Sequence, residues 1–304
     1  MNQQFRGTGV ALVTPFNRDL KVDFQQLKTL IEHVISGGVD YILSLGTTGE
    51  AITLSTAEQQ AVLDFTVKIV AKRVPLVVGC YADNDTTSLV KRLQNIDLSD
   101  FDAILSSSPS YNKPTQEGIY QHYMAIAAAS PLPILIYNVP SRTASNIEAQ
   151  TIVRLANASS KFIGVKEASG DMVQSCSIIK HAPKDFLVLS GDDQTALALT
   201  AYGGAGVISV IANAFPKEWS SMMRAALKGD WQTAQKINLA LWDIHPLLYI
   251  EGNPVGIKAA CETLHLCTKN VRLPLVDFST EQHLLLASEI QQFQCHSIAP
   301  KTVY

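Results

Sequence analysis

Eight short apolar segments alternate with longer segments of helical period along most of this 304-residue chain. The apolar segments are continuously hydrophobic, which is typical of parallel strands covered on both faces. They are residues 10–14, 41–45, 75–79, 103–106, 134–137, 162–166, 186–190 and 206–210. Eight such strand–helix units with short connections predict a (β/α)₈ barrel of the TIM type rather than an open doubly wound sheet.

The segments between the expected strands carry the apolar spacing and capping residues of α-helices. Helices are expected at residues 23–36, 56–71, 86–93, 116–129, 147–156, 172–181 and 195–201. Ser55 and Glu58 form a capping-box pattern, and Asp85, Thr115 and Asn146 are candidate N-cap residues. These features place each helix after its strand, as the barrel requires.

After the eighth strand the pattern becomes purely helical, from Lys217 to about Gln294. We expect one helix opening at Pro216 to complete the barrel, and further helices at 230–249, 255–264 and 280–292 to form an appended C-terminal helical region. Residues 1–216 would then hold the barrel strands and most helices, and residues 217–294 the last barrel helix and the appended region. Residues 295–304 lack periodicity and are expected to form a flexible tail.

The composition favours a globular protein with a large core, because 47% of residues are hydrophobic and 17% are charged. The net charge of −3 comes without a basic stripe, and no apolar segment is long enough to span a membrane. We therefore expect neither nucleic-acid nor membrane partners. Five scattered cysteines and seven histidines show no metal-ligand spacing, and no signal peptide precedes the first strand. The sequence predicts no metal site, reduced thiols and a cytoplasmic location.

Catalytic groups of such barrels lie at the C-terminal ends of the strands and in the loops that follow them. That rule selects polar residues after the second, fourth, fifth, sixth and seventh strands: Gly46-Thr47-Thr48-Gly49-Glu50, Tyr111, Tyr137 and Arg142, Lys166, and Gly191-Asp192-Asp193.

Lys166 closes the sixth apolar segment, so its side chain should rise from inside the barrel. Strand-end lysines often extend into water, which is the plainer alternative. The functional alternative is an amine made nucleophilic by burial. Burial can lower a lysine pKa by several units from about 10.4, and neutral amines form imines with carbonyl compounds.

Two further features share this end of the barrel. Tyr137 closes the fifth segment, where its phenol could relay protons beside an amine or simply fill the core. The Gly46-Thr47-Thr48-Gly49 sequence offers backbone N–H groups and two hydroxyls suited to a carboxylate, although glycine-bracketed turns are common. Each feature alone leaves both interpretations open.

Three motifs in chain order resemble the dihydrodipicolinate synthase family, which belongs to the pyruvate-dependent class I aldolases together with N-acetylneuraminate lyase. They are Gly46-Thr47-Thr48-Gly49-Glu50, Tyr137-Asn138-Val139-Pro140-Ser141-Arg142-Thr143 and Ile163-Gly164-Val165-Lys166-Glu167. The similarity runs from about Gly9 to Asn253. It makes Lys166 the expected covalent residue.

The resemblance implies that Lys166 forms an imine with pyruvate, whose enamine adds to (S)-aspartate 4-semialdehyde. The product would be 4-hydroxy-tetrahydrodipicolinate, in the first committed step of the diaminopimelate and lysine pathway. It implies no metal or organic cofactor, and a homotetramer built as a dimer of dimers.

The resemblance also implies a role for each matching residue. Thr47 and Thr48 would bind the pyruvate carboxylate, and Arg142 the carboxylate of the second substrate. Tyr137, Thr48 and Tyr111 would form a proton relay, with Tyr111 supplied by a neighbouring subunit. Gly191 and Ile208 would place backbone carbonyls near the lysine.

Two alternatives to this function stay open. A sugar-acid aldolase such as N-acetylneuraminate lyase would use the same pyruvate imine with another acceptor. Thr47 beside Thr48, together with Arg142, favours the synthase, because the related lyases commonly carry a serine and a non-basic residue there. A catalytically silent barrel that senses a keto acid is the second alternative, and the retained Lys166, Tyr137 and Thr48 argue against it.

The residues aligned with the family's lysine-inhibitor site predict weak or absent feedback inhibition by lysine. Inhibited members surround the ligand with a histidine, an asparagine, a glutamate and a tyrosine, where this chain has Thr56, Asp83, Thr87 and Ser110. Each lost charge-assisted bond costs roughly 1.5–3 kcal/mol, so losing two weakens binding by about a hundredfold. Initial rates at saturating pyruvate with millimolar lysine test this, and strong partial inhibition would contradict it.

Overall fold

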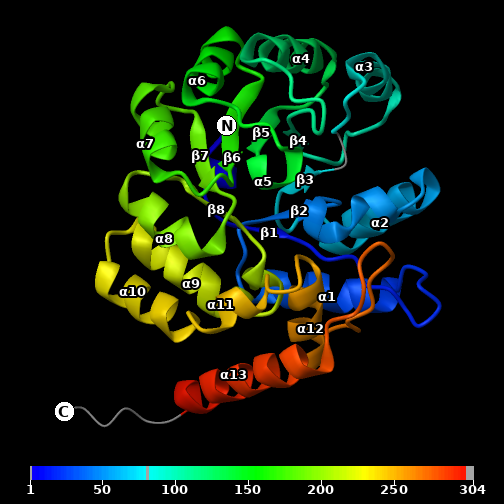
Figure 1. Cartoon of the computed structure of the whole chain (residues 1–304), viewed down its shortest axis with the longest axis vertical. Coiled ribbons are helices and arrows are strands. Elements are labelled where there is room, and N and C mark those ends of the chain that lie inside the picture. Colours follow the sequence, from blue (N-terminus) through cyan, green and yellow to red (C-terminus); the bar gives the residue numbers. More distant parts are fainter. Residues whose placement is uncertain (1, 80–81, 299–304) are drawn as a thin grey trace.

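The computed structural model describes residues 2–79 and 82–298, and it contains a closed barrel of eight parallel strands in sequence order. The strands are β1 (Gly7–Ala11), β2 (Tyr41–Ser44), β3 (Leu76–Val78), β4 (Ala103–Ser107), β5 (Ile134–Asn138), β6 (Phe162–Glu167), β7 (Leu187–Ser190) and β8 (Gly206–Ser209). Pairing of β1 with β8 closes the barrel, with Gly9 opposite Ile208. Helices surround the strands (Figure 1). The predicted (β/α)₈ fold is confirmed.

The first strand begins and ends three residues earlier than expected. Its N-terminal half contains glycine and threonine, which hide it from a search for apolar residues. Gly9 faces the ring of Tyr41, and a Cβ at this position would lie 2.2 Å from a ring carbon. Tight packing against a neighbouring strand therefore selects glycine where hydrophobicity alone predicts no strand.

The barrel helices are α1 (Phe24–Ser36), α2 (Thr56–Val70), α3 (Thr86–Asn95), α4 (Gln116–Ala129), α6 (Ala149–Ala158), α7 (Met172–His181), α8 (Asp193–Ala201) and α9 (Pro216–Leu227). A short helix, α5 (Pro140–Thr143), follows β5. The capping box of Ser55 and Glu58 is present, and Asp85 and Thr115 cap their helices as predicted.

Two barrel helices, α6 and α8, begin two residues away from their predicted starts. Asn146 does not cap α6, which begins after Glu148, because the Asn146 side chain bonds Asn138 and Gln174 instead. Helix α8 begins two residues early, since the Asp192 carboxylate accepts a hydrogen bond from the Gln194 N–H. In both cases a polar side chain near the barrel mouth decides where the helix begins.

The C-terminal region contains α10 (Trp231–Ala240), α11 (Ile244–Leu247), α12 (Val255–Thr263) and α13 (Thr280–Ile298). The expected single helix at 230–249 is wrong. Pro246 has no N–H for the carbonyl four residues earlier, and its ring would clash there. The chain instead turns after α10 through tighter bonds such as that from the Ile244 N–H to the Leu241 carbonyl.

Helix α13 packs against α11 and α12 on the outside of the molecule (Figure 1). It extends to Ile298, four residues into the segment that the sequence pattern predicts to be a tail. The remaining tail, residues 299–304, lies outside the described residues.

Apolar side chains fill the molecule in two layers. The barrel interior holds residues such as Tyr41, Leu43, Leu105 and Leu189, while a larger cluster packs between the strands and the helices. Among residues 2–79 and 82–298, no helix has the length and hydropathy needed to cross a membrane. The four cysteines in this part of the chain are free thiols, and Cys80 lies outside it.

Candidate active site

Lys166 and Tyr137 occupy opposite positions on adjacent strands, β6 and β5, at their C-terminal ends. The Lys166 Nζ lies 4.5 Å from the centre of the Tyr137 ring. Both side chains are buried, with exposed fractions of 5% and 8%. Lys166 therefore does not extend into water, and its amine lies over the aromatic ring of Tyr137.

A polar network holds these two strand ends in place. The Asn138 amide follows Tyr137 in β5 and donates to both oxygens of Glu167, at 3.1 and 3.0 Å, which follows Lys166 in β6. The side-chain Oδ1 of Asn138 accepts from the Ile147 N–H, and the Glu167 carboxylate accepts from the Ser169 N–H. The residues after the tyrosine and the lysine thus lock the register that sets their separation.

A cavity of about 570 Å³ opens at this end of the barrel. Thr47, Tyr137, Arg142 and Ser110 are among its lining residues. A larger cavity of about 710 Å³ lies at the opposite end, where Phe162 begins β6, and contains none of the expected site residues. The structure therefore brings three predicted residues to one opening, at the end where barrel enzymes hold their sites.

The two neighbouring threonines are placed differently. Thr47 is exposed and lines the cavity, whereas Thr48 is buried at 2% exposure. The Thr48 hydroxyl accepts from the Asn253 Nδ2 at 3.0 Å, and the Asn253 carbonyl accepts from Arg142 Nη2 at 3.3 Å. Asn253, from the C-terminal region, thus contacts two predicted substrate residues, although sequence reasoning assigned it no role.

Tyr111 is 90% exposed and has a left-handed backbone, with φ of 69°. Its N–H donates to the Thr143 carbonyl, so the loop that carries it is tied to the end of α5. The neighbouring Ser110 lines the cavity, whereas Tyr111 does not. Within this single chain, Tyr111 therefore does not line the cavity that Tyr137 lines.

Gly191 and Ile208 complete the predicted set. A Cβ at Gly191 would lie 2.5 Å from the Ala168 Cβ and 3.1 Å from the Lys166 Cγ, so glycine leaves the room that Ala168 and the lysine stem occupy. Ile208 is buried in β8, two strands away from β6. The carbonyl roles implied for both residues stay predictions.

Asp193 is a buried carboxylate to which sequence reasoning assigned no role. Its Oδ2 accepts from the N–H groups of Val210 and Ile211 at 2.9 and 2.8 Å, and its Oδ1 has no partner among the described residues. Burial raises the pKa of Asp193, against the opposing effects of those N–H donors and of nearby Lys166. The Asp192-Asp193 pair after the seventh strand is the sequence feature that could have indicated this carboxylate.

No cluster of three or more potential metal ligands occurs within the described ranges.

The family model for the dihydrodipicolinate synthetase family matches residues 4–293. A 4-hydroxy-tetrahydrodipicolinate synthase of Flavobacterium psychrophilum is 48% identical over 279 residues, which cover 92% of this chain and 95% of that protein.

Solved structures of the same family are also similar to this chain. Dihydrodipicolinate synthase of Acinetobacter baumannii complexed with pyruvate is 37% identical, with a TM-score of 0.91 and coverage of 95% of this chain and 99% of that one. A monomeric dihydrodipicolinate synthase variant is 33% identical, with a TM-score of 0.93 and coverage of 96% and 98%. The chain belongs to the dihydrodipicolinate synthetase family.

Proposed function

We propose that this chain condenses pyruvate with (S)-aspartate 4-semialdehyde to 4-hydroxy-tetrahydrodipicolinate, through an imine on Lys166. The buried amine of Lys166, 4.5 Å from the Tyr137 ring, is the observation that carries the proposal. The activity named for the 48% identical relative and the pyruvate bound in the Acinetobacter structure support it. No metal is needed, because the lysine itself activates the carbonyl.

Each step of the proposed reaction uses only the two substrates, Lys166 and a proton-transferring side chain. The Lys166 amine attacks the pyruvate ketone, and loss of water gives the imine. Removal of a methyl proton gives the enamine, whose carbon adds to the aldehyde. The amino group of the second substrate then attacks the imine carbon, closing the ring and expelling Lys166. Tyr137, whose ring lies 4.5 Å from the amine, would move protons in the dehydration and ring closure.

The 46–50 turn would hold the pyruvate carboxylate through its N–H groups and hydroxyls. The implied relay uses Thr48, whose hydroxyl accepts from Asn253 and keeps its own proton to donate. Thr47 shares the cavity with Tyr137 and is the competing relay hydroxyl. Comparing kcat of Thr47→Val and Thr48→Val at saturating substrates decides between them.

The panel of accepted aldehydes separates this function from a sugar-acid aldolase. Aspartate semialdehyde carries a carboxylate, and the positively charged Arg142 is among the residues that line the cavity. Turnover of pyruvate with aspartate semialdehyde, and not with N-acetylmannosamine, is the expected result.

We also propose that the enzyme works in the cytoplasm, where its free thiols stay reduced.

Arg142→Ala should lower kcat/KM for aspartate semialdehyde by about 10- to 100-fold, because an exposed charge-assisted contact to the substrate is lost. Borohydride trapping of pyruvate on Lys166 should change little. Arg154→Ala, which removes a surface arginine paired with Glu117, is the matched control. An equal loss of trapping and turnover would make Arg142 a structural residue.

We also propose a homo-oligomer, a dimer of dimers, in which Tyr111 completes the relay of a neighbouring subunit. Its 90% exposure and its absence from the lining of the cavity support a role in trans. The monomeric variant among the solved relatives makes this a question to be tested on this chain.

Mixing two inactive variants tests the shared site. Hybrids of Tyr111→Phe and Lys166→Met subunits should regain activity, because one site then combines an intact Lys166 with the intact Tyr111 of the other subunit. About a quarter of the wild-type rate is expected, because statistical mixing makes half of the dimers mixed and a two-fold interface gives each mixed dimer one complete site out of two. Mixtures no more active than their components would show that each subunit works alone.

A further inference from the structure

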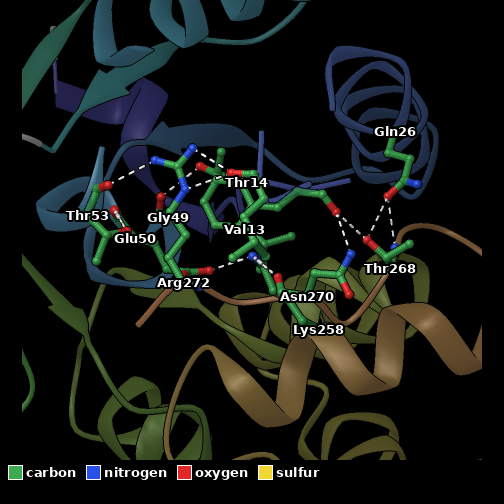
Figure 2. A network of polar contacts seen from close by, with 12 residues as sticks. Val13, Thr14, Gln26, Gly49, Glu50, Thr53, Lys258, Thr268, Asn270 and Arg272 are labelled. Carbon is green, nitrogen blue, oxygen red and sulfur yellow. Dashed lines mark hydrogen bonds and ion pairs between the residues drawn. The ribbon is translucent and has the colours of Figure 1, made fainter. Parts of the chain in front are cut away.

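A buried ion pair joins the C-terminal region to the end of the substrate turn. Lys258 of α12 donates to Glu50 Oε1 at 2.5 Å, and both side chains are almost fully buried, at 0% and 1% exposure. The same Nζ donates to the Asn270 carbonyl at 2.8 Å and lies 4.1 Å from the centre of the Phe16 ring. Figure 2 shows Lys258 and Glu50 within this network. Neither residue reaches the cavity, so the proposed chemistry leaves both without a role.

The backbone of the turn needs such a constraint. Leu45 and Glu50, at its two ends, have left-handed φ angles of 56° and 51°, which residues with a Cβ rarely adopt. Strained conformations of this kind persist only where the surroundings over-determine them, and they gather at functional sites. In the middle of the turn, the Gly49 carbonyl accepts from the Thr14 hydroxyl at 2.7 Å. The strain is therefore held by side chains from other segments.

Both carboxylate oxygens of Glu50 accept hydrogen bonds. Oε1 accepts from Lys258, and Oε2 accepts from the Arg272 backbone N–H at 3.1 Å. The Arg272 side chain reaches past the turn and donates to the Thr53 carbonyl at 2.9 Å (Figure 2). It also donates to Glu58 of α2. The segment after α12 thus holds both ends of the stretch from the turn to the next helix.

An ion pair is a poor choice if stability were the only requirement. Desolvating two charges offsets much of their attraction, and apolar residues of similar volume often stabilise a core as well. What the pair provides is direction, because an ammonium between a carboxylate and a carbonyl allows few arrangements. Glu50 is the last residue of the turn, so fixing its side chain fixes the N–H groups immediately before it.

We propose that Lys258 and Glu50 are positioning residues that set the 46–50 turn for the carboxylate of pyruvate. This inference rests on the proposed function, since it takes pyruvate as the occupant of the turn. The C-terminal region is then more than a cover on the barrel. It contributes to substrate affinity through a contact that lies behind the site.

The test measures pyruvate affinity apart from folding. Borohydride traps the imine on Lys166, and well below the melting temperature, where nearly all of the protein is folded, the pyruvate concentration that gives half-maximal trapping reports affinity alone. Lys258→Met and Glu50→Gln should raise this concentration on the order of 10- to 100-fold, the effect of a small misplacement of binding groups. Both should also lower the melting temperature, since each leaves a buried polar partner unmatched. Arg73→Gln, which breaks a surface pair with Glu32, should alter neither pyruvate affinity nor trapping.

The double variant Lys258→Met/Glu50→Gln separates positioning from stability. It buries no unpaired charge, so its melting temperature should recover towards that of the wild type, while half-maximal trapping stays raised. If pyruvate affinity recovers together with the melting temperature, the pair is only structural and the inference is overturned. Glu50→Asp keeps both charges but shortens the link, and gives the same readout if the neutral variants do not fold. A wild-type protein that traps no pyruvate would instead overturn the proposed function.

Discussion

Lys166→Met should abolish borohydride trapping of pyruvate and lower kcat/KM on the order of 10⁴-fold or more, because the covalent nucleophile is lost. Methionine matches the length of the lysine chain, so the packing against Gly191 should be kept. Mass spectrometry of the trapped wild-type enzyme should place the adduct on a peptide containing Lys166. This is the largest effect expected on activity.

The control is Lys184→Met, at an exposed lysine that precedes β7 at the other end of the barrel. Its trapping and turnover should equal those of the wild type. An adduct on any other lysine, or full turnover by Lys166→Met, would refute the imine at this position.

The largest effect expected on stability comes from His245, whose ring is completely buried and stands 5.1 Å from the ring of Trp219. Burial lowers the pKa of His245 from its ordinary 6.5 to about 4, although the nearby Asp192 opposes the change. Between these values the unfolded chain binds a proton that the folded chain rejects. The free energy of unfolding should therefore fall as the pH drops from 6.5 to about 4, by up to about 3 kcal/mol from this group.

His245→Leu should remove this part of the pH dependence. Urea denaturation at fixed protein concentration, repeated between pH 7 and pH 4, gives the free energy of unfolding for both proteins. His33 and His122, whose pKa values are also lowered by burial, contribute to both curves and cancel in the difference. His181→Leu, at an exposed position at the end of α7, is the control. Parallel curves for wild type and His245→Leu would show that this histidine is not held neutral.

Sequence alone determined the repeated strand–helix architecture and the site residues that lie at the end of a single strand. Apolar segments of strand length report burial on both faces, so the eight strands could be read without knowing their neighbours. Lys166 and Tyr137 each close such a segment, and strand order then places them side by side. The Ser55–Glu58 capping box is local as well, because its two residues are three positions apart. Features set by short-range pattern were therefore predictable.

Tertiary structure alone decided the contacts between segments far apart in the chain. Lys258 meets Glu50 across 208 positions, and Asn253 meets Thr48 across 205. Nothing in the periodicity of α12 indicates that its lysine points inward, since a charged residue ordinarily marks the solvent face of a helix. The placement of Thr47 in the cavity and Thr48 behind it also depends on the left-handed residues that bound their turn. Local pattern records how each segment is buried, whereas these pairings exist only once the chain has closed the barrel and packed its C-terminal helices against it.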